Sequence, residues 1–191
     1  MELDRNSGAT NWVTTAGGIG NDDGGPVAID SMGNIWQAGT TTGTFSVNGM
    51  THQAVSNADT ILVKWSPSGV AQSVIGFSSS ASEINLPEDM IVTSNDDVVV
   101  SGVFLGSMNA GNQNTLTDRG NGDAYVVKVL KSGITDWATS AGSSANTERA
   151  YSIAETPNGD LIAGGMISTS TTFGIHAVSY THLRAHETLE N

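Results

Sequence analysis

Short apolar runs separated by polar turn residues recur along the chain and predict β-strands. Three of the clearest runs lie at residues 59–64, 97–101 and 123–128, and they are rich in Val, Ile, Leu or Tyr. Gly, Asn, Asp, Ser or Pro stands beside each run, which is typical of turns. Residues that favour long helices are sparse. The pattern therefore predicts an all-β fold.

A repeat of about 63 residues, a length outside that of short solenoid rungs, organises these runs. Its clearest landmark is a glycine that ends a strand–turn–strand segment and recurs at equal spacing, at Gly39, Gly102 and Gly165. A second segment, 59–69, recurs at 123–133 with nearly the same spacing. A third begins at Trp12 and recurs two periods later at Trp137. Because three independent segments keep one period, we interpret the chain as a repeat protein.

Each period is long enough for about four strands. In the first period we expect them around residues 12–16, 26–29, 34–40 and 59–65. Four antiparallel strands form one blade of a β-propeller, and we predict a propeller fragment on this basis. The alternative is a β-solenoid, whose repeats are usually shorter. The polar segments 41–58 and 103–122 are expected to be insertions between the third and fourth strands.

Landmark positions of the first repeat carry a family resemblance. They are Gly17, Gly18, Asp22, Ala28, Asp30, Gly33, Asn34, Gly39, Thr40, Phe45, Asp59, Lys64 and Gly69. Together they resemble the SBBP-type bacterial β-propeller repeat of large secreted and surface proteins, over about residues 1–177. The middle repeat departs from the pattern, with Asn95 and Asp96 in place of the Gly-Asn pair. The resemblance implies an architectural or binding role rather than catalysis.

The repeat divides the chain into five expected parts. They are the end of a preceding blade (1–11), two blades (12–69 and 70–133), an incomplete blade (134–177) and a non-native tail (178–191). Residues 178–188 resemble the translation of an adapter oligonucleotide used in sequencing libraries. The tail contains His182, His186 and Glu187, whose spacing imitates half a zinc site, and we exclude them from functional reasoning.

Charge and composition exclude several classes of function. The 191 residues include 7 Lys and Arg against 19 Asp and Glu, a formal net charge of −12. So acidic a chain repels phosphate backbones, and we expect no nucleic-acid partner. No apolar run approaches the roughly 18 residues of a membrane-spanning helix. The absence of Cys excludes disulfides and thiolate metal sites.

Acidic loops are the candidate metal sites. Calcium takes oxygen ligands in flexible geometry, and two loops offer them: Asn21, Asp22 and Asp23, and separately Asp118, Asn121 and Asp123. Neither loop has the alternating Asp spacing of a calcium-binding loop. Asp123 opens a strand as Asp59 does one repeat earlier, so capping of a turn is the competing interpretation. No other cofactor is expected.

Catalytic motifs are not recognisable. Outside the tail the only histidines are His52 and His176, one in each of two insertions, and no GxSxG motif occurs. The segment 17–20 resembles a phosphate loop but lacks the following Lys and helix, so its glycines are interpreted as structural. Trp36, Trp65 and Tyr125 are expected to pack between blades, with carbohydrate stacking as the alternative.

These observations favour a non-catalytic β-propeller segment of a larger extracellular or cell-surface protein. It would act as a scaffold, an adhesion module or a ligand-binding module. Its expected partners are the other blades of the same chain and, outside it, a surface protein or a glycan. The alternative is a fragment of a glycan-binding or lyase-type propeller enzyme. Since incomplete blades leave sheet faces and edges uncovered, we also expect the isolated chain to self-associate.

Overall fold

The computed structural model describes residues 1–80, 82–167, 170–173 and 176–179, with side chains described as far as Ile167. Within these residues all regular structure is β-strand, so the all-β prediction is confirmed. The strands are β1 (Glu2–Leu3), β2 (Thr10–Trp12), β3 (Gly17–Ile19), β4 (Asp22–Ile29), β5 (Ile35–Thr41), β6 (Thr44–Val47), β7 (Met50–Gln53), β8 (Asp59–Trp65), β9 (Ala71–Ser79), β10 (Asn85–Val92), β11 (Val98–Phe104), β12 (Ser107–Asn109), β13 (Thr115–Thr117), β14 (Asp123–Val129), β15 (Thr135–Gly142), β16 (Arg149–Glu155), β17 (Leu161–Met166), β18 (Ser170–Phe173) and β19 (His176–Ser179).

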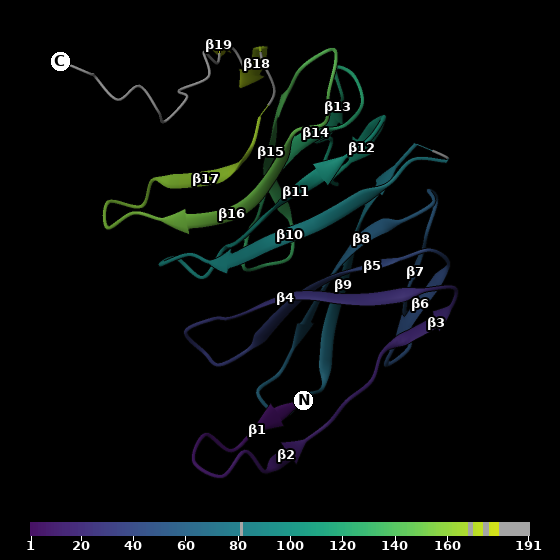
Figure 1. The fold of residues 1–191 in the computed structure, drawn as a ribbon. Helices are drawn as coiled ribbons and strands as arrows, with labels where there is room; N and C mark the ends of the chain where they lie inside the picture. The colour runs from purple at the N-terminus through teal and green to yellow at the C-terminus, as the bar shows by residue number, and fades with distance from the viewer. Residues whose placement is uncertain (81, 168–169, 174–175, 180–191) are drawn as a thin grey trace, which may run out of the picture.

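Two four-stranded antiparallel units form the body of the molecule. The first sheet contains β4, β5, β8 and β9 in spatial order, and the second contains β10, β11, β14 and β15. The pair β16–β17 follows them (Figure 1). The described sheets form an open series and do not close a ring. No helix able to span a bilayer is found in this part of the chain.

The grouping of strands differs from the expected one. Strand β9, which starts at Ala71, is the last strand of the first sheet and not the first strand of the second. Strand β2 lies one repeat before β9 in the sequence and pairs in the same way with the strand before it, β1. The cause is the tight turn at 66–69, where Gly69 N donates to Ser66 O at 2.9 Å. A tight turn pairs the strands on its two sides antiparallel. The expected limits at 69 and 133 therefore fall inside hairpins.

Part of the expected C-terminal organisation lies outside the described residues. The offset between the segments 59–69 and 123–133 places a third copy near residue 187, beyond the last described residue. The expected non-native tail is described only as far as Ser179, in β19. His182, His186 and Glu187 also lie outside the described residues.

An apolar layer joins the two four-stranded sheets. Trp36, Leu62 and Phe77 of the first sheet are fully buried with Val98 and Tyr125 of the second in one core cluster. Strand β10 packs against β4 and β5 on one side and against β16 on the other, as its place between them shows (Figure 1). Burial of one such large side chain contributes about 1.5–3 kcal/mol, so this layer is the main stabilising contact between sheets.

The glycine that recurs once per repeat lies opposite a bulge. Each copy faces an irregularity in the first strand of its sheet, in β4, β10 and β16. At Gly102 a Cβ atom would lie 2.0 Å from Leu86 O, and at Gly165 it would lie 1.9 Å from Arg149 O. The bulge brings two backbones so close that a side chain does not fit. This close approach explains the glycine period seen in the sequence.

The insertions form hairpins that reach back to the preceding sheet. Hairpin β12–β13 leaves the second sheet and pairs with the end of β9, at Met108 opposite Ser79. Strand β18 pairs in the same way with β15, and β6 with β3. Each insertion therefore extends a strand that precedes its own sheet. The polar segments predicted as insertions have this linking role.

A polar contact made by a turn serine also recurs, with a carboxylate from a different position of the following repeat in each case. The backbone N and Oγ of Ser31 donate to the carboxylate of Asp96, at 2.8 and 2.7 Å. One repeat later, the backbone N and Oγ of Ser94 donate to the carboxylate of Glu155, at 2.7 and 3.0 Å. We call each of these contacts a serine–carboxylate staple. It aligns the edges of consecutive sheets.

The bulge contact predicts a position-specific cost of adding one methyl group. Gly102→Ala is expected to lower the free energy of unfolding by about 1–3 kcal/mol, because the backbone of Leu86 must move. Gly164→Ala, on β17 with nothing within 4 Å of the added atom, is the matched control and should change it by less than about 0.5 kcal/mol. Urea unfolding followed by circular dichroism measures both; equal effects would contradict the close approach.

Candidate functional site

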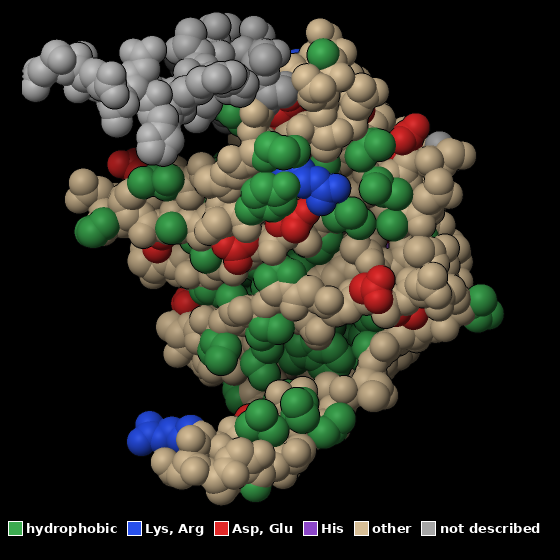
Figure 2. All heavy atoms as spheres, viewed as in Figure 1, with side chains coloured by type: hydrophobic (Ala, Val, Ile, Leu, Met, Phe, Trp, Pro, Cys, Tyr) green, Lys and Arg blue, Asp and Glu red, His purple; other side chains and the backbone are tan. Residues whose placement is uncertain are grey.

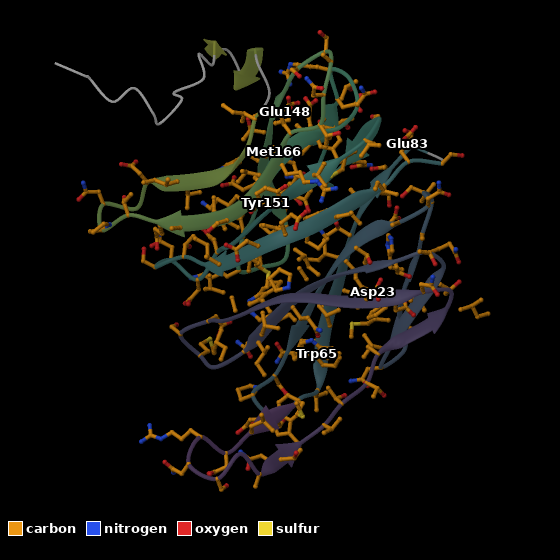
Figure 3. The ribbon with its side chains drawn as sticks, viewed as in Figure 1. Asp23, Trp65, Glu83, Glu148, Tyr151 and Met166 are labelled. Carbon is orange, nitrogen blue, oxygen red and sulfur yellow. The ribbon has the colours of Figure 1, made fainter. Side chains whose placement is uncertain are left out.

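A cleft of about 340 Å³ opens between the first sheet and the N-terminal segment. Its floor is apolar and comes from β5 and β8, and its rim carries polar groups. The residues that matter most for its chemistry are Trp12, Asp22, Asp23, Val27, Ile35, Gln37, Val63 and Trp65. Figure 2 shows hydrophobic side chains gathered in the recess between β4 and the N-terminal hairpin, and Figure 3 places Trp65 there.

Three polar atoms at this cleft lack hydrogen-bond partners among the described residues. They are Trp12 Nε1, Trp65 Nε1 and Asp22 Oδ1, and all three are buried. The second carboxylate oxygen of Asp22 accepts a hydrogen bond from Gly18 N at 2.8 Å. Buried polar atoms normally have partners. The cleft can therefore accept a group that offers both hydrogen-bonding atoms and apolar surface.

The next repeat shows which hydrogen-bond donor meets the side-chain oxygen at the position equivalent to Asp22 Oδ1. Asn85 occupies the position of Asp22 one repeat later and holds the end of the preceding strand, β9, by donating to Ser79 Oγ at 3.0 Å. Its Oδ1 accepts a hydrogen bond from Thr60 N of the neighbouring sheet at 2.6 Å. Asp22 thus lies at the position from which Asn85 joins two sheets, and its Oδ1 accepts no hydrogen bond from the described residues.

A second cluster surrounds Asp59, whose side chain is fully buried. His52 Nε2 donates to Asp59 Oδ2 at 2.9 Å, Ser78 Oγ donates at 2.6 Å, and Ser56 Oγ and Val55 N also donate to the carboxylate. Burial alone would raise the pKa of Asp59, but these hydrogen bonds outweigh it and lower the pKa to about 2. Asp59 therefore ties the β6–β7 insertion to β8 and β9.

Asp123 has the same position in the second sheet, with a different side-chain partner. Arg119 pairs with it at 2.9 Å and also donates its backbone N. Burial of the carboxyl raises the pKa of Asp123 in spite of Arg119. The sequence-based interpretation of Asp59 and Asp123 as turn caps agrees with these contacts. The His52–Asp59 pair was not recognised from the sequence, although the cation at the matching insertion, Arg119, is a signal for it.

The structure places the side chains of four of the six calcium candidates, all but Asn21 and Asp23, in hydrogen bonds within the described residues. Asp22 and Asp23 open β4 at the cleft (Figure 3), where Asp22 holds Gly18. Asp118 accepts a hydrogen bond from Gly106 N at 2.8 Å, and Asn121 donates to Ala145 O at 2.9 Å. Within the described residues no group of three or more His, Cys, Asp or Glu is arranged to hold a metal ion. Calcium at either loop stays a prediction.

The two histidines and the strand aromatics complete the sequence-based candidates. His52 reaches one carboxylate, Asp59, and its ring occupies the space above Gly76. His176 lies in β19, where side chains are outside the described set. Trp36 and Tyr125 are fully buried between the sheets, as expected of packing residues. Trp65 is also buried, in a second core cluster on the other face of the first sheet, and it lines the cleft as well.

Comparison with known family models and with curated proteins finds no match for this sequence.

The lowered pKa of Asp59 predicts an acid-sensitive contribution to stability. Because its pKa in the folded state is about 2 and that of a free Asp is near 3.9, the stabilisation is complete above about pH 4 and is lost as the pH falls toward 2. Asp59→Asn should lower the free energy of unfolding by about 2 kcal/mol at pH 7 and flatten its pH dependence between pH 4 and 2. Asp160→Asn, at an exposed turn, is the control. An unchanged pH profile in Asp59→Asn would contradict the assignment.

The carboxylate contacts also predict the response to calcium. Asp123 is paired with Arg119, and Asp118 holds a backbone amide. Millimolar calcium should therefore change the melting temperature by no more than the same concentration of magnesium does. Differential scanning calorimetry in each salt makes the comparison. A calcium-specific rise that Asp118→Asn abolishes would establish a site in this loop.

Proposed function

We propose that this chain is a non-catalytic segment of a β-propeller that belongs to a larger secreted or surface protein. Its units would be four-stranded blades, the number of strands in a propeller blade. It would serve as a scaffold that presents its insertion hairpins for adhesion or ligand binding. The resemblance to SBBP-type repeats and the acidic, Cys-free composition support the extracellular placement.

The repeated contact between consecutive sheets is the observation that carries this proposal. Three elements make up the contact: an apolar layer, a serine–carboxylate staple and an insertion hairpin that pairs with the preceding sheet. A device that repeats with the period can join any number of sheets. A scaffold requires a contact that joins each sheet to the next and recurs along the chain. An enzyme instead requires one site that differs from the others.

The use of the ionisable side chains supports the non-catalytic part of the proposal. A catalytic site needs a nucleophile, a base and an orienting group within reach of a substrate. Here His52 and Asp59 hydrogen-bond each other, and Arg119 pairs with Asp123, in each case to hold an insertion against its sheet. Each of these groups has a structural task.

A second candidate function, glycan binding or a lyase-type reaction, rests on the cleft. Trp12 and Trp65 line it with unpaired indole N–H groups, although Trp65 is 4% exposed, and Asp22 and Asp23 offer carboxylates. Aromatic faces beside carboxylates suit sugar rings and their hydroxyl groups. The equivalence of Asp22 with the sheet-joining Asn85 is the reason that the scaffold is preferred.

One experiment separates the two functions. The chain is incubated with neutral and uronate-containing polysaccharides, and both product formation and tryptophan fluorescence are recorded. For a scaffold we expect no turnover and an unchanged emission spectrum. Binding in the cleft would shift the emission, and the shift would be lost in Trp65→Phe but kept in Trp36→Phe, whose indole lies between the sheets. Turnover that Asp23→Asn abolishes would overturn the non-catalytic proposal.

A further inference from the structure

The cleft lies on the face of the first sheet that corresponds to the packed face of the second sheet. In the second sheet, this face is covered by the first sheet. Val27 at the cleft is 56% exposed, whereas its counterpart Met90 is 4% exposed, because the first sheet covers it. Trp65, which lines the cleft, is 4% exposed, and its counterpart Val129 is fully buried in the core between the sheets. This face of the first sheet therefore corresponds in position to a sheet-binding surface. Val27 is its exposed part, while Val63 and Trp65 are buried in a smaller core cluster, and the N-terminal segment lines the other side of the cleft. We call Val27, Ile35, Val63 and Trp65 the receiving face.

A complementary face lies at the other end of the series. Ile162 on β17 pairs with Ala154, as Trp36 on β5 pairs with Ala28, so Ile162 is the counterpart of Trp36. Trp36 is fully buried against the second sheet, but Ile162 is 62% exposed. The outer edge of β17 also has no strand partner within the described part of the chain. We call Ile162 and Met166 the docking face.

We propose that this chain associates head to tail, with the docking face of one copy packed on the receiving face of the next. The proposal rests on the sheet-on-sheet scaffold proposed above. A second copy is the occupant that the structure supports, since it holds both halves of an interface already formed inside each molecule by β4 and β5 against β10. The two faces differ, so the contact is heterologous and adds copies in series instead of closing a symmetric pair.

The intermolecular contact is weaker than its internal template for an identifiable reason. At the position of Ser31 and Ser94 the docking sheet has Pro157, which has neither an N–H nor a hydroxyl group. At the position of Asp96 the receiving sheet has Gly33. The staple is therefore absent between copies. Association depends on apolar contact, and it should rise with protein concentration and change little with salt.

Charge substitutions on the two faces test the contact. Val27→Glu and Ile162→Glu should each raise the dissociation constant by about tenfold or more, because each buries a carboxylate in an apolar contact. Both residues are exposed in the single chain, so folding is kept. Ile134→Glu, at an exposed turn, is the control with the same charge change. Sedimentation velocity over a range of concentrations measures association.

Mixing the two face variants tests the head-to-tail arrangement. Val27→Glu keeps a working docking face, and Ile162→Glu keeps a working receiving face. An equimolar mixture should therefore form a complex of two copies and stop there, while each variant alone stays monomeric. A mixture that stays monomeric, or a symmetric dimer of either variant alone, would overturn the arrangement.

Installing the missing staple gives a test in the opposite direction. Pro157→Ser together with Gly33→Asp should tighten association, since Ser donors on one copy then meet a carboxylate on the next. Gly33 has φ near +79° and Asp96, its counterpart, near +65°, so the backbone accommodates Asp there. The proposal fails if the chain stays monomeric at every concentration or if the face variants behave like Ile134→Glu. Ser94→Ala separates the failure of this proposal from the failure of the scaffold proposal. If Ser94→Ala lowers the stability of a chain that stays monomeric, the head-to-tail proposal fails and the scaffold proposal is kept.

Discussion

Burial of one sheet face against the next is the interaction on which this molecule depends. The first sheet contributes Trp36, Leu62 and Phe77, and the second contributes Val98 and Tyr125, to a core that neither sheet could form alone. An antiparallel sheet with an uncovered apolar face is poorly stable, and stacking removes that face from solvent. The order of sheets along the chain follows from this need, because the turn-linked strands of one sheet end where the next begins.

The connections between sheets serve the same stacking. The bulge opposite Gly102 bends β10 where the second sheet lies against the first, and the glycine removes the side chain that would block it. The insertions return to the preceding sheet and are held there by buried carboxylates, with His52 on Asp59 and Arg119 on Asp123. These ionisable groups resemble catalytic residues, but they stabilise the contacts between an insertion and its neighbouring strands.

The cleft has to be interpreted through this repeated geometry. Considered alone, two indoles and two carboxylates around an apolar floor resemble a sugar site. Considered beside the second sheet, the same positions are those that a neighbouring sheet covers, and the unpaired oxygen of Asp22 corresponds to the oxygen of Asn85 that Thr60 satisfies. Because the chain repeats, each exposed position can be compared with an equivalent position that is covered. A protein without repeats would not allow this comparison.

The sequence by itself determined the β-class, the period and the positions of most strands, because alternation, turn residues and recurrence are local properties. It also marked Gly39, Gly102 and Gly165 without a reason for them. Only the tertiary structure decided that β9 closes the first sheet, that the insertions pair backwards and that His52 meets Asp59. Each of these contacts depends on several segments at once, and the residue types at their ends are compatible with more than one partner. How the sheets stack decides which partner each one has, since a carboxylate or an indole takes its role from the surface packed against it.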